Sequence, residues 1–312
     1  MSAVRAERTL GKTGFTVSRL GLGTAEIGFA YGLGAPELPS EDDAIKLLRT
    51  AVELGVTFFD TANYYGLAEE RLGKSGILKD SRVVVCTKCA KFLEDGDVIA
   101  PAEMEKKIFE QVERSLQKLR IETLPLLLLH GPSAEQLREG VLTEVISKLK
   151  EEGKIRYWGV STRGEEAPLA AIECGADAVQ VAFSIADRRM AARVFPTARE
   201  HGVGVVNRSV YLNGAFAGRA PNLPPTLARL RNAVVRAKEI ADRGGLTLPE
   251  LALRFTLSEP AIAVSLVGTA SAEHLREARH AIERGPLAPD IVSALRPLAI
   301  DDPNEVDPAR WN

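Results

Sequence analysis

Four residues have side chains that can move a proton, and their spacing places them at related points along the chain. Asp60, Lys88 and His130 each close a run of mainly apolar residues, and Tyr65 lies five residues after Asp60. An isolated buried charge is costly, but Asp60 and Lys88 can neutralise each other. Tyr, Lys, Asp and His are all side chains that can act as general acids or bases. The set therefore predicts an acid–base site.

Each of these residues also has a purely structural explanation. An Asp can cap a helix, a Lys can lay its stem along apolar surface, a His can be a satisfied core residue and a Tyr can pack over a rim. These explanations weaken when they are combined, because three ionisable residues would interrupt three buried strands at the same end. A shared site accounts for all of them at once.

The elements that would position these residues alternate along the chain. Short β-branched segments are separated by longer amphipathic segments, which is typical of βα units and a parallel sheet. There are eight such segments, so we expect an α/β protein with a (β/α)8 TIM barrel, whose chemistry lies at the C-terminal ends of the strands. The expected strands are residues 19–23, 56–60, 83–88, 125–130, 157–161, 178–183, 204–208 and 263–268.

The expected helices carry start signals and apolar faces. Ser40 can cap the first one, and Glu41 and Asp42 favour the positive end of its dipole. A segment at 5–18, with Gly11 and Gly14 between short extended pieces, predicts an N-terminal β-hairpin that caps the bottom of the barrel. We expect residues 1–312 to form one domain. The expected helices are 40–54, 102–119, 142–152, 166–173, 190–201, 249–258 and 272–282, with an additional one at 227–241.

Composition narrows the class of protein. The 312 residues are 45% hydrophobic, and 40 basic residues against 42 acidic ones give a formal net charge of −2. This balance gives no electrostatic case for nucleic acid or an anionic membrane as partner, and no apolar run is long enough to span a bilayer. The first residues lack the apolar stretch of a signal peptide. We expect a cytoplasmic protein that acts on small molecules, as a monomer or a homo-oligomer.

Cys86 and Cys89 form a CxxC pattern, which in other contexts binds zinc or forms a disulfide. Here the pair follows Val83, Val84 and Val85, so it is expected on a buried strand. Residues three apart on a strand point to opposite faces and cannot share a metal or a bridge. Both thiols are therefore expected to be packing residues. With no other metal-binding motif in the sequence, we expect no metal site.

The sequence motifs around the four residues closely resemble those of the aldo-keto reductase family. They are FDTANYYG at 59–66, TK at 87–88 and LH at 129–130. Further matches are LGLGT at 20–24, GKIR at 153–156, GVS at 159–161, Gln180, and LVG at 266–268. The resemblance covers essentially residues 5–282.

The resemblance implies an NAD(P)H-dependent oxidoreductase that reduces an aldehyde or ketone to an alcohol. It implies Tyr65 as general acid, Lys88 and Asp60 as the pair that tunes it, and His130 as the residue that orients the carbonyl. A Lys ammonium about 4 Å from a Tyr hydroxyl, at an effective dielectric of about 20, favours the tyrosinate by up to about 4 kcal/mol before desolvation is subtracted. That corresponds to roughly three pKa units.

The resemblance also implies a set of cofactor contacts. Ser161 and Gln180 would contact the nicotinamide carboxamide, Thr162 replaces the Asn that the family often has, and Arg208 stands where a residue stacks on the nicotinamide. A planar guanidinium can stack on a ring. The other implied cofactor-binding residues are Gly23, Thr24, Asp60, Ser209, Leu212, Gly268, Thr269, Ser271, His274 and Glu277.

The resemblance determines the cofactor preference, the direction of the reaction and the substrate less closely than it determines the reaction type. Relatives that strongly prefer NADPH tend to have a Lys after the eighth strand and an Arg six residues later, whereas this chain has Gly268 and His274. We expect NADP(H) with modest preference and usable NAD(H). An NAD-dependent aldose or alcohol dehydrogenase, or a non-catalytic cofactor-sensing regulatory subunit, remain alternatives. Substrate choice is assigned to the loops at 26–39, 91–100 and 211–225 and to the tail at 285–312.

Overall fold

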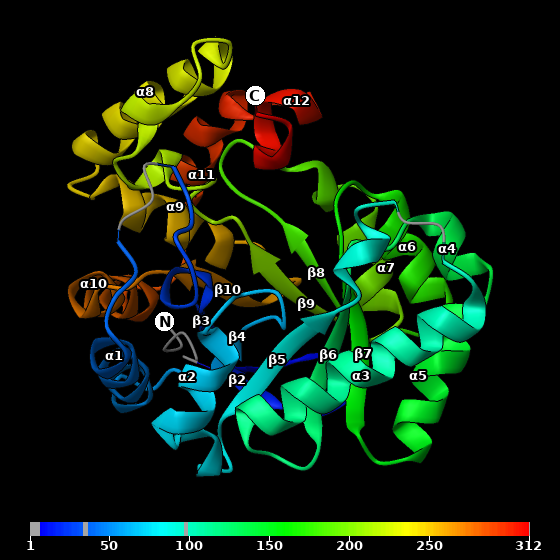
Figure 1. Cartoon of the computed structure of the whole chain (residues 1–312). Coiled ribbons are helices and arrows are strands. Elements are labelled where there is room, and N and C mark those ends of the chain that lie inside the picture. The colour runs from blue at the N-terminus through cyan, green and yellow to red at the C-terminus, as the bar shows by residue number, and fades with distance from the viewer. Residues whose placement is uncertain (1–6, 34–36, 97–98, 312) are drawn as a thin grey trace.

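The computed structural model describes residues 7–33, 37–96 and 99–311. Eight parallel strands close into a barrel in the order β10-β3-β4-β5-β6-β7-β8-β9 (Figure 1). This confirms the expected (β/α)8 barrel. The barrel strands are β3 Leu20–Gly23, β4 Phe58–Asp60, β5 Val84–Cys89, β6 Leu124–His130, β7 Ile155–Ser161, β8 Ala178–Ala182, β9 Gly204–Arg208 and β10 Ile262–Gly268.

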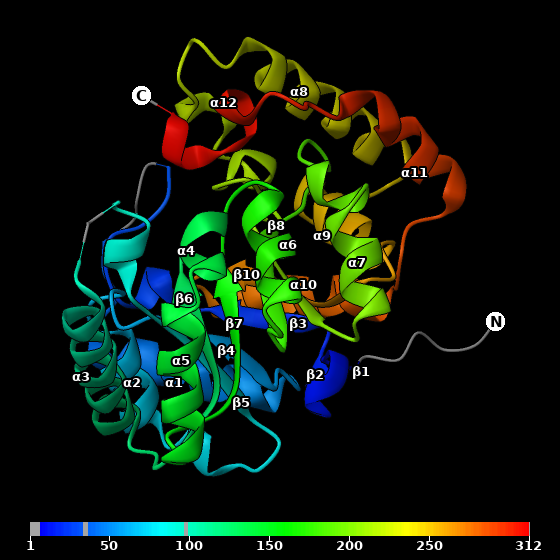
Figure 2. The same cartoon turned by 90° about the vertical axis from the view of Figure 1, so that its right-hand side faces the viewer.

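Helices surround the barrel on its outside (Figure 2). Ser40 caps the first one as expected, because its side chain accepts a hydrogen bond from the backbone N–H of Asp43. The helices that follow the eight barrel strands in turn are α1 Glu41–Glu53, α2 Ala68–Ser75, α3 Pro101–Leu119, α5 Val141–Glu151, α6 Glu166–Glu173, α7 Val194–Glu200, α9 Leu248–Leu257 and α10 Ala272–Glu283. Additional helices are α4 Ala134–Arg138, α8 Ala228–Arg243, α11 Pro289–Leu295 and α12 Pro303–Val306.

A hairpin closes the N-terminal end of the barrel. Strands β1 (Glu7–Thr9) and β2 (Thr16–Ser18) pair antiparallel, which confirms the expected cap over residues 7–18, while Arg5 and Ala6 lie outside the described residues. The backbone at Gly11 has φ +51°, and a Cβ there would lie 2.3 Å from the backbone nitrogen of Gly204. Only glycine permits this approach of the hairpin to the start of β9.

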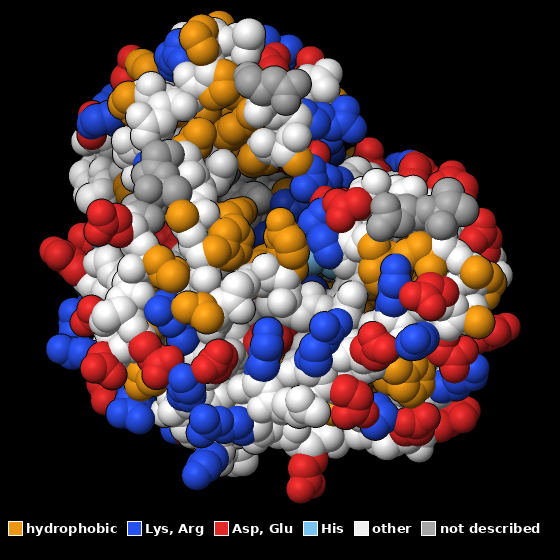
Figure 3. All heavy atoms as spheres, in the orientation of Figure 1, with side chains coloured by type: hydrophobic (Ala, Val, Ile, Leu, Met, Phe, Trp, Pro, Cys, Tyr) orange, Lys and Arg blue, Asp and Glu red, His pale blue; other side chains and the backbone are white. Residues whose placement is uncertain are grey.

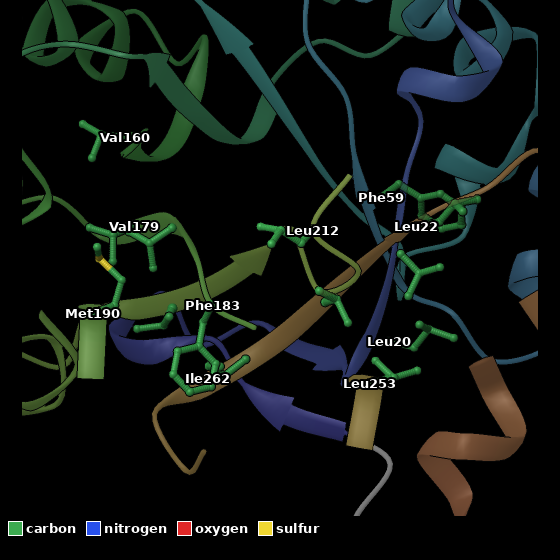
Figure 4. Packing of buried hydrophobic residues seen from close by; sticks show 14 of the residues in the cluster. Leu20, Leu22, Phe59, Val160, Val179, Phe183, Met190, Leu212, Leu253 and Ile262 are labelled. Atoms are coloured by element: carbon green, nitrogen blue, oxygen red, sulfur yellow. The ribbon is translucent and has the colours of Figure 1, made fainter. Parts of the chain in front are cut away.

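Two apolar clusters fill the molecule. The smaller one combines alternate strand residues such as Phe58, Cys86 and Leu128 with Leu10 and Val17 of the hairpin, so it fills the inside of the barrel. The larger cluster lies between the strands and the helices, and Figure 4 shows part of it. The alternation also separates the two cysteines of the CxxC pattern, since Cys86 belongs to the inner cluster and Cys89 to the outer one.

Several element boundaries differ from the sequence-based expectation, most of them by one or two residues, and two of the differences have a clear cause. The helix expected at 190–201 is wrong as a single element, because a 3-10 turn at Arg189–Ala191 precedes α7, which begins at Val194. Pro196 then falls in the first turn of α7, where a missing N–H costs no hydrogen bond. Strand β4 begins at Phe58 rather than Val56, because the backbone N–H of Thr57 donates to the Ser18 hydroxyl of the hairpin at 2.8 Å.

The C-terminal segment lies over the end of the barrel where the strands finish. Helices α11 and α12 lie beside α8 in Figures 1 and 2. Asp307, just after α12, forms an ion pair at 3.4 Å with Arg163 in the loop after β7. Figure 3 shows a hollow between this group of helices and the rest of the molecule, with Lys and Arg side chains along its wall. Within the described ranges, no helix is long and apolar enough to cross a membrane.

Candidate active site

The barrel register brings the four sequence-predicted residues to one end. Asp60 is the last residue of β4, Lys88 the penultimate residue of β5 and His130 the last residue of β6. Because the strands are parallel neighbours in the order β4-β5-β6, their C-terminal ends meet at the same rim. Tyr65 lies in the loop between β4 and α2, above that rim.

Lys88 and Asp60 form a buried ion pair. The Lys88 ammonium nitrogen lies 2.7 Å from each Asp60 carboxylate oxygen and donates to the Thr61 carbonyl at 3.0 Å. The two residues are 1% and 4% exposed, so water cannot replace either partner. The same ammonium lies 3.4 Å from the Tyr65 hydroxyl oxygen, which makes Lys88 the link between the carboxylate and the tyrosine.

The Tyr65 side chain is partly buried and held on several sides. Its ring lies 5.8 Å from the Phe29 ring and 6.5 Å from the His130 ring, centroid to centroid. Burial raises the pKa of Tyr65 above its ordinary value, and the Lys88 ammonium opposes this effect without cancelling it. The effect of desolvation on the pKa of Tyr65 therefore exceeds that of the attraction between the Lys88 ammonium and a tyrosinate. Tyr65 is protonated at neutral pH in the free protein.

Tyr64 occupies a different environment from its neighbour. It is 58% exposed, and its ring lies 6.4 Å from Phe29 and 5.7 Å from the Lys91 ammonium. Its contacts are therefore with surface groups of the loops, while Tyr65 has the contact with Lys88. Of the two adjacent tyrosines, only Tyr65 contacts the buried ion pair within the described residues.

His130 is neutral at physiological pH. Burial, followed by the nearby positive charges of Lys88, Lys91, Arg208 and Arg163, lowers the pKa of His130 to about 3. A neutral imidazole carries one N–H, which can donate to an oxygen. Its Nδ1 is buried and has no hydrogen-bond partner among the described residues, while its Nε2 lies 3.9 Å from the Glu94 carboxylate.

A chain of polar side chains runs from the ion pair to the neighbouring strands. The Gln180 amide nitrogen donates to Asp60 at 2.6 Å, and the Ser161 hydroxyl donates to the Gln180 oxygen at 2.8 Å. Arg208, at the end of β9, donates to the Thr162 carbonyl at 3.0 Å. The structure thus connects four of the sequence-predicted cofactor residues by hydrogen bonds, and Gln180 among them contacts Asp60 directly.

The remaining predicted cofactor residues lie in the loops after β9 and β10, at the end of β3 and on α10. Ser209 and Leu212 both have left-handed backbone, at φ +62° and +46°, which is uncommon for residues with a side chain. Ser271 caps α10 by accepting from the backbone N–H of His274, and Thr269 lies 3.4 Å from the His274 ring. Thr24 and Gly23 lie at the end of β3, and Gly268 follows on the adjacent β10, whereas Glu277 is exposed on α10.

Several residues at the rim were not predicted from the sequence. The Glu94 carboxylate forms ion pairs with Lys91 at 2.9 Å and with Arg163 at 2.7 Å, beside His130. Glu26 reaches toward Arg219, with a closest nitrogen–oxygen distance of 3.9 Å. All lie in the loops that the sequence analysis assigned to substrate choice or adjoin them. No periodicity marks such residues, because their positions depend on the path of each loop.

The chain is similar to known proteins over most of its length. Residues 19–300 match the model of the aldo/keto reductase family. L-galactose dehydrogenase from Arabidopsis thaliana is 30% identical over 291 residues, covering 86% of each chain. D-threo-aldose 1-dehydrogenase from a Pseudomonas species is 26% identical, covering 82% of this chain and 86% of its own. An aldo-keto reductase from Bacillus halodurans, solved in its holo form, superposes with a TM-score of 0.79 at 27% identity, covering 98% and 99%.

Proposed function

The chain belongs to the aldo/keto reductase family, and from that premise we propose that it reduces an aldehyde or ketone to an alcohol, with Tyr65 as general acid. One observation carries the proposal. The Lys88 ammonium is bound by both oxygens of Asp60 and lies 3.4 Å from the Tyr65 hydroxyl, at the rim of the barrel. A buried ammonium in that place has a clear use in stabilising negative charge as it develops on a tyrosine oxygen.

Each of the four residues has a separate role in the proposed reaction. The Tyr65 hydroxyl gives its proton to the carbonyl oxygen as negative charge develops there, and the Lys88 ammonium stabilises the tyrosinate that is left. Asp60 keeps Lys88 in place by two hydrogen bonds of 2.7 Å. Neutral His130 donates its N–H to the carbonyl oxygen and so orients and polarises it. A bound reduced nicotinamide would supply the hydride to the carbonyl carbon.

The residues at the rim fit a nicotinamide dinucleotide. Thr162 has a buried hydroxyl oxygen without a hydrogen-bond partner among the described residues, beside Ser161 and Gln180. These three side chains would hold the carboxamide end, and Arg208 would stack on the ring. The twelve-residue helix α10 directs its positive end, capped by Ser271, toward the loop after β10, where phosphate oxygens would be stabilised.

The turn after β10 leads us to expect a modest cofactor preference. Gly268 has no side chain to reach a 2′-phosphate, and His274 is exposed. The residues left as possible phosphate contacts are Thr269, Ser271, Arg276 and Arg219. We expect NADPH to bind more tightly than NADH by less than about a hundredfold, roughly 2.8 kcal/mol. Dissociation constants for both cofactors measure this ratio. Arg276→Ala should weaken the binding of NADPH and leave the binding of NADH unchanged. If NADPH binds more than a hundredfold more tightly than NADH even in this variant, the phosphate site lies elsewhere.

The proposed activity is tested by following the absorbance of the reduced cofactor with an activated aromatic aldehyde. We expect absorbance to fall with wild-type protein at neutral pH. A protein that binds the cofactor tightly but consumes none of it with any aldehyde offered would instead be a cofactor-sensing regulatory subunit. The aldehyde test separates these two functions because only the first one turns over.

A second candidate function is oxidation of a hydroxyl compound with NAD. It is favoured by the names of two relatives, L-galactose dehydrogenase and D-threo-aldose 1-dehydrogenase. The same residues serve both directions, since a tyrosinate stabilised by Lys88 accepts the proton that the tyrosine donates in reduction. Comparing kcat/KM for aldehyde reduction with that for aldose oxidation, under one set of conditions, decides which direction dominates.

A further inference from the structure

A carboxylate faces the residue that is expected to hold the substrate carbonyl. Glu94 lies in the loop that follows β5, directly after a 3-10 turn at Lys91–Leu93. One of its oxygens is 3.9 Å from the Nε2 of His130, and its side chain is only 18% exposed. The proposed mechanism gives Glu94 no part in the proton or hydride transfer, so its place at the rim needs another explanation.

Glu94 is held in this position from several directions. Lys91 contacts one carboxylate oxygen at 2.9 Å and Arg163 the other at 2.7 Å. Its stem lies directly over Gly131, the residue after His130, where a Cβ would come within 2.4 Å of the Glu94 Cβ. Gly131 has φ +73°, so both its backbone conformation and its missing side chain permit this packing.

The ion pairs leave the carboxylate able to accept another hydrogen bond. Each carboxylate oxygen offers about two acceptor positions, and each has one cationic partner here. The oxygen paired with Lys91 is the one 3.9 Å from His130, so its remaining position is available beside the Nε2 atom. A donor on the substrate would therefore meet a charged acceptor next to the bound carbonyl. A substrate carboxylate in the same place would meet like charge.

We propose that Glu94 binds a hydroxyl group on the carbon next to the substrate carbonyl, so that the preferred substrates are α-hydroxy aldehydes and ketones, including aldoses. In such a substrate the carbonyl and hydroxyl oxygens lie roughly 3 Å apart by ordinary bond lengths. This spacing suits an N–H donor and a carboxylate acceptor that are 3.9 Å apart, with one hydrogen bond to each oxygen. The inference rests on the proposed carbonyl reductase function and names its substrate class.

The test compares two small aldehydes that differ by the hydroxyl groups. Glyceraldehyde has a hydroxyl next to its carbonyl, and propanal has none. For Glu94→Leu we expect kcat/KM for glyceraldehyde to fall about 10- to 100-fold more than kcat/KM for propanal, the range for losing a hydrogen bond to a charged group. Glu94→Gln keeps one acceptor oxygen at the same place and should recover part of the loss. If Glu94 acted only on folding or on the position of His130, its substitution would lower kcat/KM for both aldehydes by the same factor.

Asp95 supplies the matched control. It contacts Lys91 at 2.6 Å, as Glu94 does, but its side chain is 56% exposed. Asp95→Leu removes a charge from the same lysine and should leave the glyceraldehyde-to-propanal ratio as in wild type. An unchanged ratio in Glu94→Leu would overturn the assignment of Glu94 while reduction of propanal still supports the proposed function. A wild-type protein that reduces the activated aromatic aldehyde but neither small aldehyde would overturn the inference alone. One that reduces none of the three aldehydes with either cofactor would overturn both.

Discussion

Tyr65→Phe is expected to lower kcat/KM for carbonyl reduction by about 10²- to 10⁴-fold, the usual loss when a general acid is removed. The substitution deletes one oxygen atom and keeps the ring that packs against Phe29 and His130. Fold and cofactor affinity should therefore survive. Steady-state kinetics with one aldehyde and a binding titration with the cofactor measure the two quantities separately.

Tyr64→Phe is the control that makes this result specific. Tyr64 is adjacent in sequence and also aromatic, but it is 58% exposed and its contacts are with Phe29 and Lys91. Its substitution should leave kcat/KM within a few-fold of wild type. If Tyr64→Phe is the inactive protein, or if both variants remain fully active, the assignment of the acid to Tyr65 is wrong.

The sequence was sufficient for the barrel because its signals are local. Each β-branched run and each amphipathic segment predicts its own element, and the count of eight predicts closure. One boundary failed because a distant contact decides it. The Thr57 N–H donates to the Ser18 hydroxyl of the hairpin, a partner that residues 56–60 do not reveal. The other boundary failed on a local signal, because Pro196 lies within the expected helix and falls in the first turn of α7.

The candidate site likewise has features that the sequence predicts and features that it does not. Asp60 and Lys88 could be paired from the sequence because residues at the ends of neighbouring parallel strands must meet. The net pKa shift of Tyr65 could not be predicted, because it depends on how far burial outweighs the Lys88 ammonium. Glu94 was missed because its contact with His130 depends on a loop that folds back over Gly131. Spacing along the chain carries no signal for such a contact.

Lys88→Met is expected to lower both activity and stability strongly. Without the ammonium, the pKa of Tyr65 is raised further by burial, so the hydroxyl becomes a weaker acid and the tyrosinate has no cation beside it. We expect kcat/KM to fall by about 10²-fold or more. The variant also leaves the Asp60 carboxylate buried without its partner, which costs about 3–5 kcal/mol of unfolding free energy. Denaturant unfolding and steady-state kinetics measure the two losses.

The double substitution Asp60→Asn with Lys88→Met separates these two effects. Replacing both members of a buried ion pair by neutral groups of similar size is often neutral for stability, so most of the unfolding free energy should return. Activity should stay low, because the tyrosine still has no ammonium 3.4 Å from its hydroxyl. If the double variant recovered activity along with stability, the ion pair would serve the fold alone. Proton donation by Tyr65 would then have to be stabilised by another group.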